Sequence, residues 1–168
     1  MEVRQATLSD IEAFRAFILE AWRQAGPDAL GWTGASEEAV AKIASREYLT
    51  SLFSKPDTRV FLAVTGDRVM GFASNSRVDE ETVELSGIVV LDSMIGRGIG
   101  SRLLEASVGA ALSDGYSRVL VRTETFNDRA LAFYKSKGFK AVAQHTISVE
   151  GVDVEVVALV LQLDRNQY

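Results

Sequence analysis

The chain has 168 residues, of which 47% are hydrophobic and 24% charged, the balance of an ordinary soluble globular domain with a sizeable core. Its net charge of −5 argues against nonspecific nucleic-acid binding and mildly favours cationic partners such as amines. The sequence has no cysteine and one histidine, which excludes disulfides, cysteine nucleophiles, thiolate metal sites and histidine metal clusters. No apolar run approaches the roughly 18 residues of a membrane span, and no signal-peptide pattern follows Met1. We therefore expect a cytoplasmic protein without membrane or nucleic-acid partners.

The first part of the chain predicts one short strand and then two amphipathic helices. The strand covers residues 3–6, and Ser9 or Asp10 would cap the first helix, whose apolar side chains recur at helical spacing. A glycine-containing loop over residues 26–36 would end this helix. A second helix is then expected over residues 36–54, before a stop at a Lys-Pro-Asp sequence.

The rest of the chain predicts six strands and two helices. A hairpin signal at Thr65-Gly66-Asp67-Arg68 joins the first two of these strands, and a Glu150-Gly151 turn joins the last two. One helix would end at Ser113, and the other would cover residues 127–137, with Gly138 in the usual helix-ending position. The expected strands cover residues 59–64, 69–77, 83–90, 118–124, 139–149 and 152–163.

The resulting element order is β-α-α-β-β-β-α-β-α-β-β, with no long linker and no internal repeat. We therefore expect one α+β domain over residues 1–168. Its central sheet should be mixed and mostly antiparallel, because hairpins join the middle strands, and helices should flank it. The strands over residues 83–90 and 118–124 should be parallel, since a helical crossover connects them.

The most informative segment is Ile95-Gly96-Arg97-Gly98-Ile99-Gly100-Ser101, which follows the β-branched run Ile88-Val89-Val90 and precedes a helical pattern. A glycine-rich loop between a strand and a helix points several backbone N–H groups, and the positive end of the helix dipole, at one spot. The usual occupant of such a spot is a phosphate or pyrophosphate. On its glycines alone, the segment is equally well explained as a plain tight connection.

Two familiar phosphate-binding patterns do not fit this loop. A P-loop has Lys and then Ser or Thr after its last glycine, whereas Gly100 is followed by Ser101-Arg102. The dinucleotide fingerprint has the spacing G-x-G-x-x-G in the first βαβ unit, whereas here the spacing is G-x-G-x-G after several strands. A nucleotide triphosphatase or a dinucleotide-binding domain is therefore disfavoured.

A second motif changes the interpretation of the loop. The segment Asn127-Asp128-Arg129-Ala130-Leu131-Ala132-Phe133-Tyr134-Lys135-Ser136-Lys137-Gly138-Phe139 combines an Asn N-cap, a short helix and a Gly-Phe exit. It follows the glycine-rich loop by one helix and one strand. The two motifs, in this order and spacing, resemble the GNAT superfamily of acyl-CoA N-acyltransferases, and the expected element order matches along nearly the whole chain. The one departure is Ile95, where that family usually has Gln or Arg.

The resemblance implies acetyl-CoA as the acyl donor, CoA as a product, no metal, and an amine as the acceptor. The acceptor class would be a small amine, a polyamine or a peptide amine. The pyrophosphate of the cofactor would lie on the backbone amides of Gly96, Arg97, Gly98, Ile99, Gly100 and Ser101. Because these amides do most of the binding, Ile95 weakens the expectation little and leaves Arg97 and Arg102 as the nearest cations.

The resemblance also implies how the acyl arm of the cofactor is held. The pantetheine arm carries amides and would pair with the backbone edge of Ile88, Val89 and Val90, as an added strand does. The family splays its sheet between this strand and the strand over residues 118–124. The thioester would lie in that gap, with the Val90 N–H as the simplest donor to its carbonyl oxygen.

Tyr134 is the expected proton donor to the leaving thiolate, because the family places a tyrosine at this point of the motif. A phenol titrates near 10 and a thiol near 8.5, so a phenolic O–H stabilises a developing thiolate without full ionisation. The alternative is a tyrosine that only packs the helix on the sheet. Asn127 has two readings as well, as a helix N-cap and as a contact to the cofactor.

The general base is open among three residues. Glu84 and Ser86 share one face of their strand by alternation, and Ser86 falls where some family members carry a glutamate base. Glu84 lies one pleat earlier and could act through water, while Glu124 at the end of the neighbouring strand is the rival. Each carboxylate is equally well a solvated surface charge, and a water chain could replace a base. His145 lies outside both motifs and is interpreted as structural or surface.

The sequence is therefore compatible with three functions. The first is an active N-acetyltransferase, the second a non-catalytic acyl-CoA-binding module, and the third a generic nucleotide-binding protein. Paired monomers are common in the family, and the exposed edges of the final strands could pair, which would give a homodimer.

Overall fold

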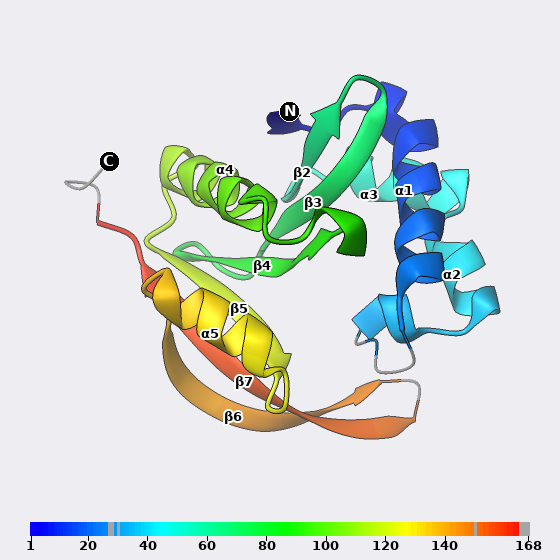
Figure 1. Ribbon diagram of the computed structural model, residues 1–168. Helices are drawn as coiled ribbons and strands as arrows, with labels where there is room; N and C mark the ends of the chain where they lie inside the picture. Colours follow the sequence, from blue (N-terminus) through cyan, green and yellow to red (C-terminus); the bar gives the residue numbers. More distant parts are fainter. Residues whose placement is uncertain (27–28, 30, 150, 165–168) are drawn as a thin grey trace. The chain divides into compact units, whose positions relative to one another are not determined.

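The computed structural model describes residues 1–26, 29, 31–149 and 151–164. They form a mixed sheet with the strand order β1-β2-β3-β4-β5-β7-β6 together with helices, which confirms the expected α+β class (Figure 1). No helix among the described residues is long and apolar enough to cross a membrane. The strands are β1 (Glu2–Gln5), β2 (Thr58–Thr65), β3 (Arg68–Arg77), β4 (Thr82–Val90), β5 (Arg118–Glu124), β6 (Lys140–Val149) and β7 (Val152–Gln162). The α-helices are α1 (Ile11–Gln24), α2 (Glu37–Ile43), α3 (Arg46–Ser54), α4 (Ile99–Ser113) and α5 (Asp128–Ser136).

The chain divides into two compact units. The first unit comprises Met1–Ser74 and Ile88–Ser107, and the second comprises Asn75–Gly87 and Val108–Tyr168. Strands β3 and β4 and helix α4 each begin in one unit and end in the other. The single domain over residues 1–168 stays a prediction.

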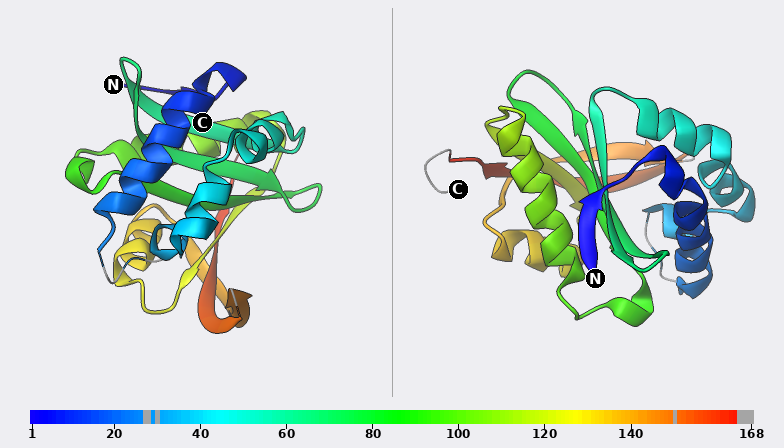
Figure 2. Two further views of the ribbon diagram at one scale, coloured as in Figure 1. Left: turned by 90° about the vertical axis from the view of Figure 1, so that its right-hand side faces the viewer. Right: turned by 90° about the horizontal axis from the view of Figure 1, so that it is seen from above.

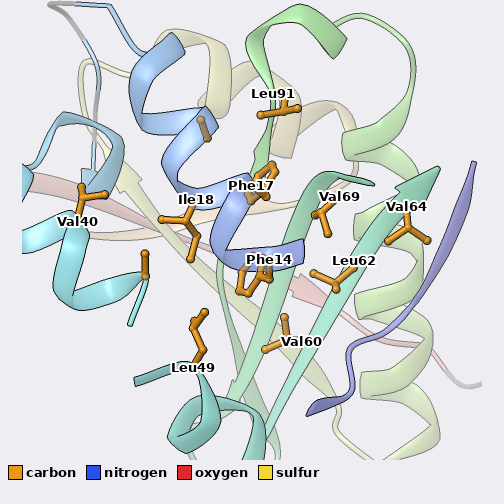
Figure 3. Close-up of a cluster of buried hydrophobic side chains, with 12 residues drawn as sticks. Phe14, Phe17, Ile18, Val40, Leu49, Val60, Leu62, Val64, Val69 and Leu91 are labelled. Atoms are coloured by element: carbon orange, nitrogen blue, oxygen red, sulfur yellow. The ribbon is translucent and has the colours of Figure 1, made fainter. Parts of the chain in front are cut away.

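The first unit has its hydrophobic core between the N-terminal helices and the sheet. Phe14, Phe17 and Ile18 on one face of α1 meet apolar side chains of α2, α3, β2 and β3 (Figure 3). The Phe14 ring lies 5.0 Å from that of Phe72 and 5.7 Å from that of Phe53, and such aromatic pairs add about 0.5–1.5 kcal/mol beyond burial. The first half of α4 covers the opposite face of β2 and β3 (Figure 2, right).

The start of α1 differs from the prediction. Asp10 occupies the N-cap position of α1 but makes no side-chain cap bond there. Its carboxylate instead accepts from the Thr7 amide at 2.7 Å and from both terminal nitrogens of Arg4, and it closes the short 3-10 turn Leu8–Asp10. These bonds, with the Arg4 hydrogen bond the largest cause, lower the pKa of Asp10 to about 2. Ser9 hydrogen-bonds to the Thr7 hydroxyl. Asp10 is therefore the N-cap residue of α1 by position, as one of the two predictions had it, but its side chain does not bond to the first amides of the helix.

The expected second helix is two helices. The chain leaves the helical path at Ala44, and the Ser45 hydroxyl then accepts a hydrogen bond from the Tyr48 amide at 3.2 Å, which caps α3. Serine side chains compete well for such amides, so a serine inside an apolar-periodic run can restart a helix. The loop prediction over residues 26–36 and the turn at Glu150-Gly151 include Pro27, Asp28, Leu30 and Glu150, which lie outside the described residues.

The second unit contains the parallel pair that the crossover predicts. β4 pairs with β5 in parallel from Thr82↔Arg118 to Leu85↔Val121. β5 pairs antiparallel with β7, and β7 pairs antiparallel with β6. The last strand therefore lies between β5 and β6, an insertion that the local sequence did not predict. α5 begins after Asn127 and ends before Gly138, as expected.

Candidate functional site

The glycine-rich loop lies in the first unit and leads directly into α4. A 3-10 turn over Asp92–Met94 folds the chain back after β4, and the Ile95 amide donates to the Asp92 carbonyl at 3.3 Å. Gly96 and Gly98 then have φ angles of +80° and +75°. A β-carbon at either position would meet no atom within 4 Å, so the backbone conformation, and not crowding, calls for glycine there.

The loop leaves a row of amides without partners. The Arg102 amide donates to the Gly98 carbonyl at 3.2 Å, the first backbone bond of α4. Within the part of the chain that the structure describes, the amides from Gly96 to Ser101 donate no hydrogen bond. Orphan amides at the N-terminus of a helix, together with its dipole, form an anion site. The six residues expected to bind pyrophosphate are thus brought together.

Two arginines accompany this anion site. Arg97 is exposed and has no ion-pair partner among the described residues. The Arg102 guanidinium makes one long contact of 3.4 Å to the Met1 carbonyl. Ile95, the departure from the family pattern, has an exposed side chain. Both arginines that the sequence analysis named as the nearest cations to a phosphate are therefore exposed.

The edge of β4 next to the loop is fixed by close packing. A β-carbon on Gly71 of β3 would lie 2.8 Å from the Val89 carbonyl oxygen and 3.2 Å from Leu103 of α4. The Leu91 amide donates to the Met70 carbonyl of β3 at 3.0 Å. Because successive amides of an extended chain point to opposite sides, the Val90 N–H points away from β3. This is the orientation that a donor to an incoming thioester needs.

Tyr134 lies in the second unit and is 5% exposed. Its ring packs edge-on against Phe133 and Phe139, with ring centroids 5.3 Å and 5.4 Å away. Burial raises the pKa of Tyr134 to about 12, so the phenol stays protonated through the physiological range. The hydroxyl has no hydrogen-bond partner among the described residues. A buried ring with an unused O–H suits a hydrogen-bond donor.

Asn127 is confirmed as a helix N-cap. Its side-chain oxygen accepts from the Ala130 amide at 3.1 Å and satisfies one of the orphan amides of α5. The amide nitrogen of the same side chain is not used in this bond. The cap role therefore leaves a donor for the second, cofactor-binding role, which stays a prediction.

The three base candidates share one face of the sheet in the second unit. Glu84 pairs with Leu120 and Glu124 pairs with Val156 in the strand registers, and Ser86 lies two residues after Glu84. Since side chains alternate along a strand, all three point to the same side. Ser86 is exposed, whereas Glu84 and Glu124 are half-buried.

α5 covers the other face. A β-carbon on Gly138 would lie 3.4 Å from Leu161, and Leu161 pairs with Val119, which points away from the side of Glu84. Tyr134 and the carboxylates therefore belong to opposite faces of the second unit's sheet. The strands therefore separate the expected proton donor from the base candidates.

Arg122 is a partner of a base candidate that the sequence alone did not reveal. Its Nη1 lies 2.6 Å from Oε1 of Glu84, and the two side chains are 38% and 25% exposed. Alternation along β5 places Arg122 on the same face as Glu124. The sequence does not show that β5 pairs with β4 in the register that brings Arg122 next to Glu84. Glu124 has a weaker contact, accepting from the Thr123 hydroxyl at 3.4 Å.

Among the described residues, no group of three or more His, Asp or Glu side chains could hold a metal ion. His145 is exposed on β6.

The chain belongs to the acetyltransferase (GNAT) family, whose model matches residues 15–139. This range includes the glycine-rich loop and the segment from Asn127 to Phe139. The chain is similar to a mycothiol acetyltransferase of Corynebacterium efficiens, 26% identical over 91 residues that cover 54% of this chain and 31% of that protein. The match therefore spans less than a third of that relative's length.

Solved structures support the same fold. A protein of Streptococcus mutans superposes with a TM-score of 0.73 at 25% identity, covering 98% of this chain and all of that one. The PaiA N-acetyltransferase of Thermoplasma acidophilum, solved in complex with coenzyme A, superposes with a TM-score of 0.72 at 19% identity, covering 96% and 98% of the two chains.

Proposed function

We propose that residues 1–168 act as one N-acetyltransferase domain that transfers the acetyl group of acetyl-CoA to an amine. The row of unpartnered amides from Gly96 to Ser101, at the start of a 15-residue helix in a chain of the GNAT family, carries this proposal. Such a row suits a pyrophosphate. The neighbour crystallised with coenzyme A supports the choice of ligand.

The cofactor would be held mainly by backbone. The six amides take the pyrophosphate, and Arg97 adds a positive charge beside it. The pantetheine amides pair with the edge of Ile88, Val89 and Val90, where Gly71 lets β3 and α4 pack tightly behind the strand. Ile95 has no phosphate role in this arrangement, because the amides replace the side chain that the family usually has there.

The proposed reaction is direct attack of a neutral amine on the thioester. The amine nitrogen bonds to the carbonyl carbon and gives up one proton to water as the amide forms. The carbon–sulfur bond breaks, and CoA leaves as a thiolate that takes up a proton. The Val90 N–H stabilises the charge that develops on the carbonyl oxygen. The chemistry needs acetyl-CoA alone and assigns no step to a metal.

Tyr134 would stabilise the leaving thiolate as a hydrogen-bond donor. Full proton transfer from a phenol with a pKa of about 12 to the thiolate of a thiol near 8.5 is uphill by about 5 kcal/mol. Donation without transfer has no such cost, and the thiolate then takes its proton from water. The raised pKa therefore favours this role over that of a full acid.

The attacking ammonium must lose a proton before it reacts. We assign this step to Glu84 or Glu124, with Ser86 as an anchor for a bridging water. Arg122 holds Oε1 of Glu84 and leaves Oε2 for the ammonium or its water. The amine class stays as expected, a small amine, a polyamine or a peptide amine.

One observation favours a second candidate, a non-catalytic acyl-CoA-binding module. The carboxylate of Glu84 already has a cationic partner in Arg122, so a cationic acceptor has to compete for it. A module of this kind would bind CoA as well and would acetylate nothing.

A thiol-release assay separates the two candidates. The protein is mixed with acetyl-CoA and a panel of small amines, polyamines and peptides with free N-termini, and free CoA thiol is measured. The proposal predicts turnover with at least one class and a new amide in the product by mass spectrometry. Tight CoA binding without turnover on the whole panel would favour the module.

A further inference from the structure

An ion pair lies on the face of the second unit's sheet that is opposite to α5. It joins Arg122 of β5 to Glu84 of β4, the strand that runs parallel beside it (Figure 1). The one contact is 2.6 Å, from Nη1 of the arginine to Oε1 of the glutamate. The two side chains are 38% and 25% exposed, so a small molecule can reach both.

The contact uses a small part of what the two groups can bond. A guanidinium can donate from each of its nitrogens, and a carboxylate can accept at both oxygens. Among the described residues, Nε and Nη2 of Arg122 donate no hydrogen bond, and Oε2 of Glu84 accepts none. Nε and Nη2 form one edge of the planar guanidinium, and this edge suits the two oxygens of a carboxylate.

Arg118 shows how a structural arginine on the same face behaves. Because side chains alternate along a strand, Arg118 and Arg122 point to the same side of β5. Nε of Arg118 donates to the Thr82 hydroxyl at 2.7 Å, and its Nη2 lies 3.0 Å from Oε2 of Glu81. The two arginines are equally exposed, at 37% and 38%. The Nε–Nη2 edge is therefore occupied in Arg118 and open in Arg122.

The charges of the ion pair decide which acceptor it suits. An acceptor whose only charge is an ammonium can bond to Glu84, but it then brings a second positive charge next to Arg122, and like charges repel. An acceptor with a carboxylate beside its ammonium adds one charge of each sign. Its carboxylate meets the guanidinium edge and its ammonium meets Oε2 of Glu84, so each of the four charges has an opposite neighbour.

We propose that the acceptor is a free α-amino acid, with its carboxylate on Nε and Nη2 of Arg122 and its ammonium on Oε2 of Glu84. This inference rests on the proposed acetyl transfer and narrows its acceptor class. In an α-amino acid a single carbon joins the two charged groups, which keeps them close together, as the side chains of the ion pair are. A polyamine has no carboxylate, and a peptide N-terminus carries an amide in its place.

The reaction leaves the carboxylate of the acceptor unchanged. The ammonium first gives up a proton to Glu84 or to its water. The amine nitrogen then bonds to the acetyl carbon and loses a second proton to water as the amide forms. The carbon–sulfur bond breaks, and CoA leaves as a thiolate that takes up a proton. The product is an N-acetylated amino acid.

Pairs of acceptors that differ only in the carboxylate test the role of Arg122. Glycine, alanine, leucine and glutamine are each compared with the corresponding α-amide in the thiol-release assay. We expect kcat/KM to be at least about tenfold higher for the free acids. Arg122→Gln should lower this preference about tenfold, mainly through KM for the acid. Because both proteins use the same acceptors, differences in amine basicity cancel.

Two further variants control for charge and for folding. Arg122→Lys keeps the charge without the planar edge, so its preference should lie between those of the wild type and Arg122→Gln. Arg118→Gln is the matched control, because this arginine has the same exposure on the same face, and it should leave the preference unchanged. Circular dichroism of each variant reports whether the chain is still folded.

A binding measurement needs no turnover. In wild-type protein saturated with CoA, the NMR signal of the Arg122 Nε–H group should shift with leucine and not with leucinamide. Absence of thiol release with every amine and peptide overturns the proposed function, and this inference with it. Turnover without preference for the free acids, or a preference that Arg122→Gln retains, overturns this inference alone.

Discussion

The two units of the molecule contribute different kinds of group to the proposed site. In the first unit, the amides from Gly96 to Ser101 and the edge of β4 are backbone groups, set by two glycines and a helix start. In the second unit, Tyr134, Glu84 and Glu124 are side chains on opposite faces of a sheet. A site made of backbone amides should tolerate changes of side chain, such as Ile95 beside the proposed cradle, whereas a side-chain site is lost with a single atom. Binding and turnover should therefore fail separately.

The largest expected effect is on turnover. Tyr134→Phe removes only the hydroxyl, so it should lower kcat about 100-fold while leaving the Kd for CoA within about twofold. Tyr48→Phe, at an exposed tyrosine on α3, is the matched control and should change neither quantity. Steady-state kinetics and calorimetry provide both numbers. An unchanged kcat in Tyr134→Phe would remove this residue from the mechanism.

The next effect is on the packing behind β4. Gly71→Ala forces a β-carbon to within 2.8 Å of the Val89 carbonyl and 3.2 Å of Leu103, and it should lower the free energy of unfolding by about 2 kcal/mol. Urea denaturation measures this loss. Gly109→Ala, where a β-carbon meets nothing within 4 Å, should not destabilise the chain. Equal stability of the two variants would mean that β3 and β4 are not closely packed at Gly71.

A smaller effect is expected on binding. Gly98→Ala forces an alanine into a φ of +75°, a conformation that costs about 1 kcal/mol or more. Relaxation of the loop would turn the amides, so the Kd for CoA should rise about tenfold. Gly109→Ala again serves as control, because Gly109 lies within α4, the helix that the loop precedes, and has open space around it. If Gly98→Ala bound CoA as tightly as the wild type, the loop would not be the cradle.

The smallest effect concerns the pH dependence of stability and lies outside both sites. Asp10 has a pKa of about 2 in the folded chain against 3.8 for the unperturbed group. Because folding lowers the pKa of Asp10, its carboxylate stabilises the fold at pH values above the pKa of the unfolded chain. This contribution is lost as the pH falls from about 4 to about 2. Asp10→Asn should therefore cost about 1–2 kcal/mol at pH 7, and the difference from wild type should shrink below pH 4. A difference that is constant with pH would contradict the ion pair with Arg4.

Most of the fold and the conformation of the glycine-rich loop were predictable because their signals are local. The glycine spacing fixed the loop before α4, the apolar periodicity fixed α1, and an Asn and a Gly fixed the ends of α5. The break at Ser45 was missed because apolar periodicity continues through it. The insertion of β7 between β5 and β6 has no local signal, since it depends on the pairing of β7 with β5, a strand distant in the sequence.

The side-chain part of the site was predictable only in outline. Alternation placed Glu84 and Ser86 on one face, but the partner of Glu84 depends on the register of β4 and β5. That register brings in Arg122, which belongs to neither motif. The raised pKa of Tyr134 likewise depends on how deeply the fold buries its side chain. Such facts come from tertiary packing.

The central claim is that backbone amides from Gly96 to Ser101 bind the pyrophosphate of CoA. Amide chemical shifts measured by NMR during titration with CoA, and separately with pantetheine, test it most directly. The account predicts large shifts at residues 96–101 with CoA only, and shifts at residues 88–90 with both ligands. Saturable CoA binding that leaves the amides of residues 96–101 unshifted would contradict it.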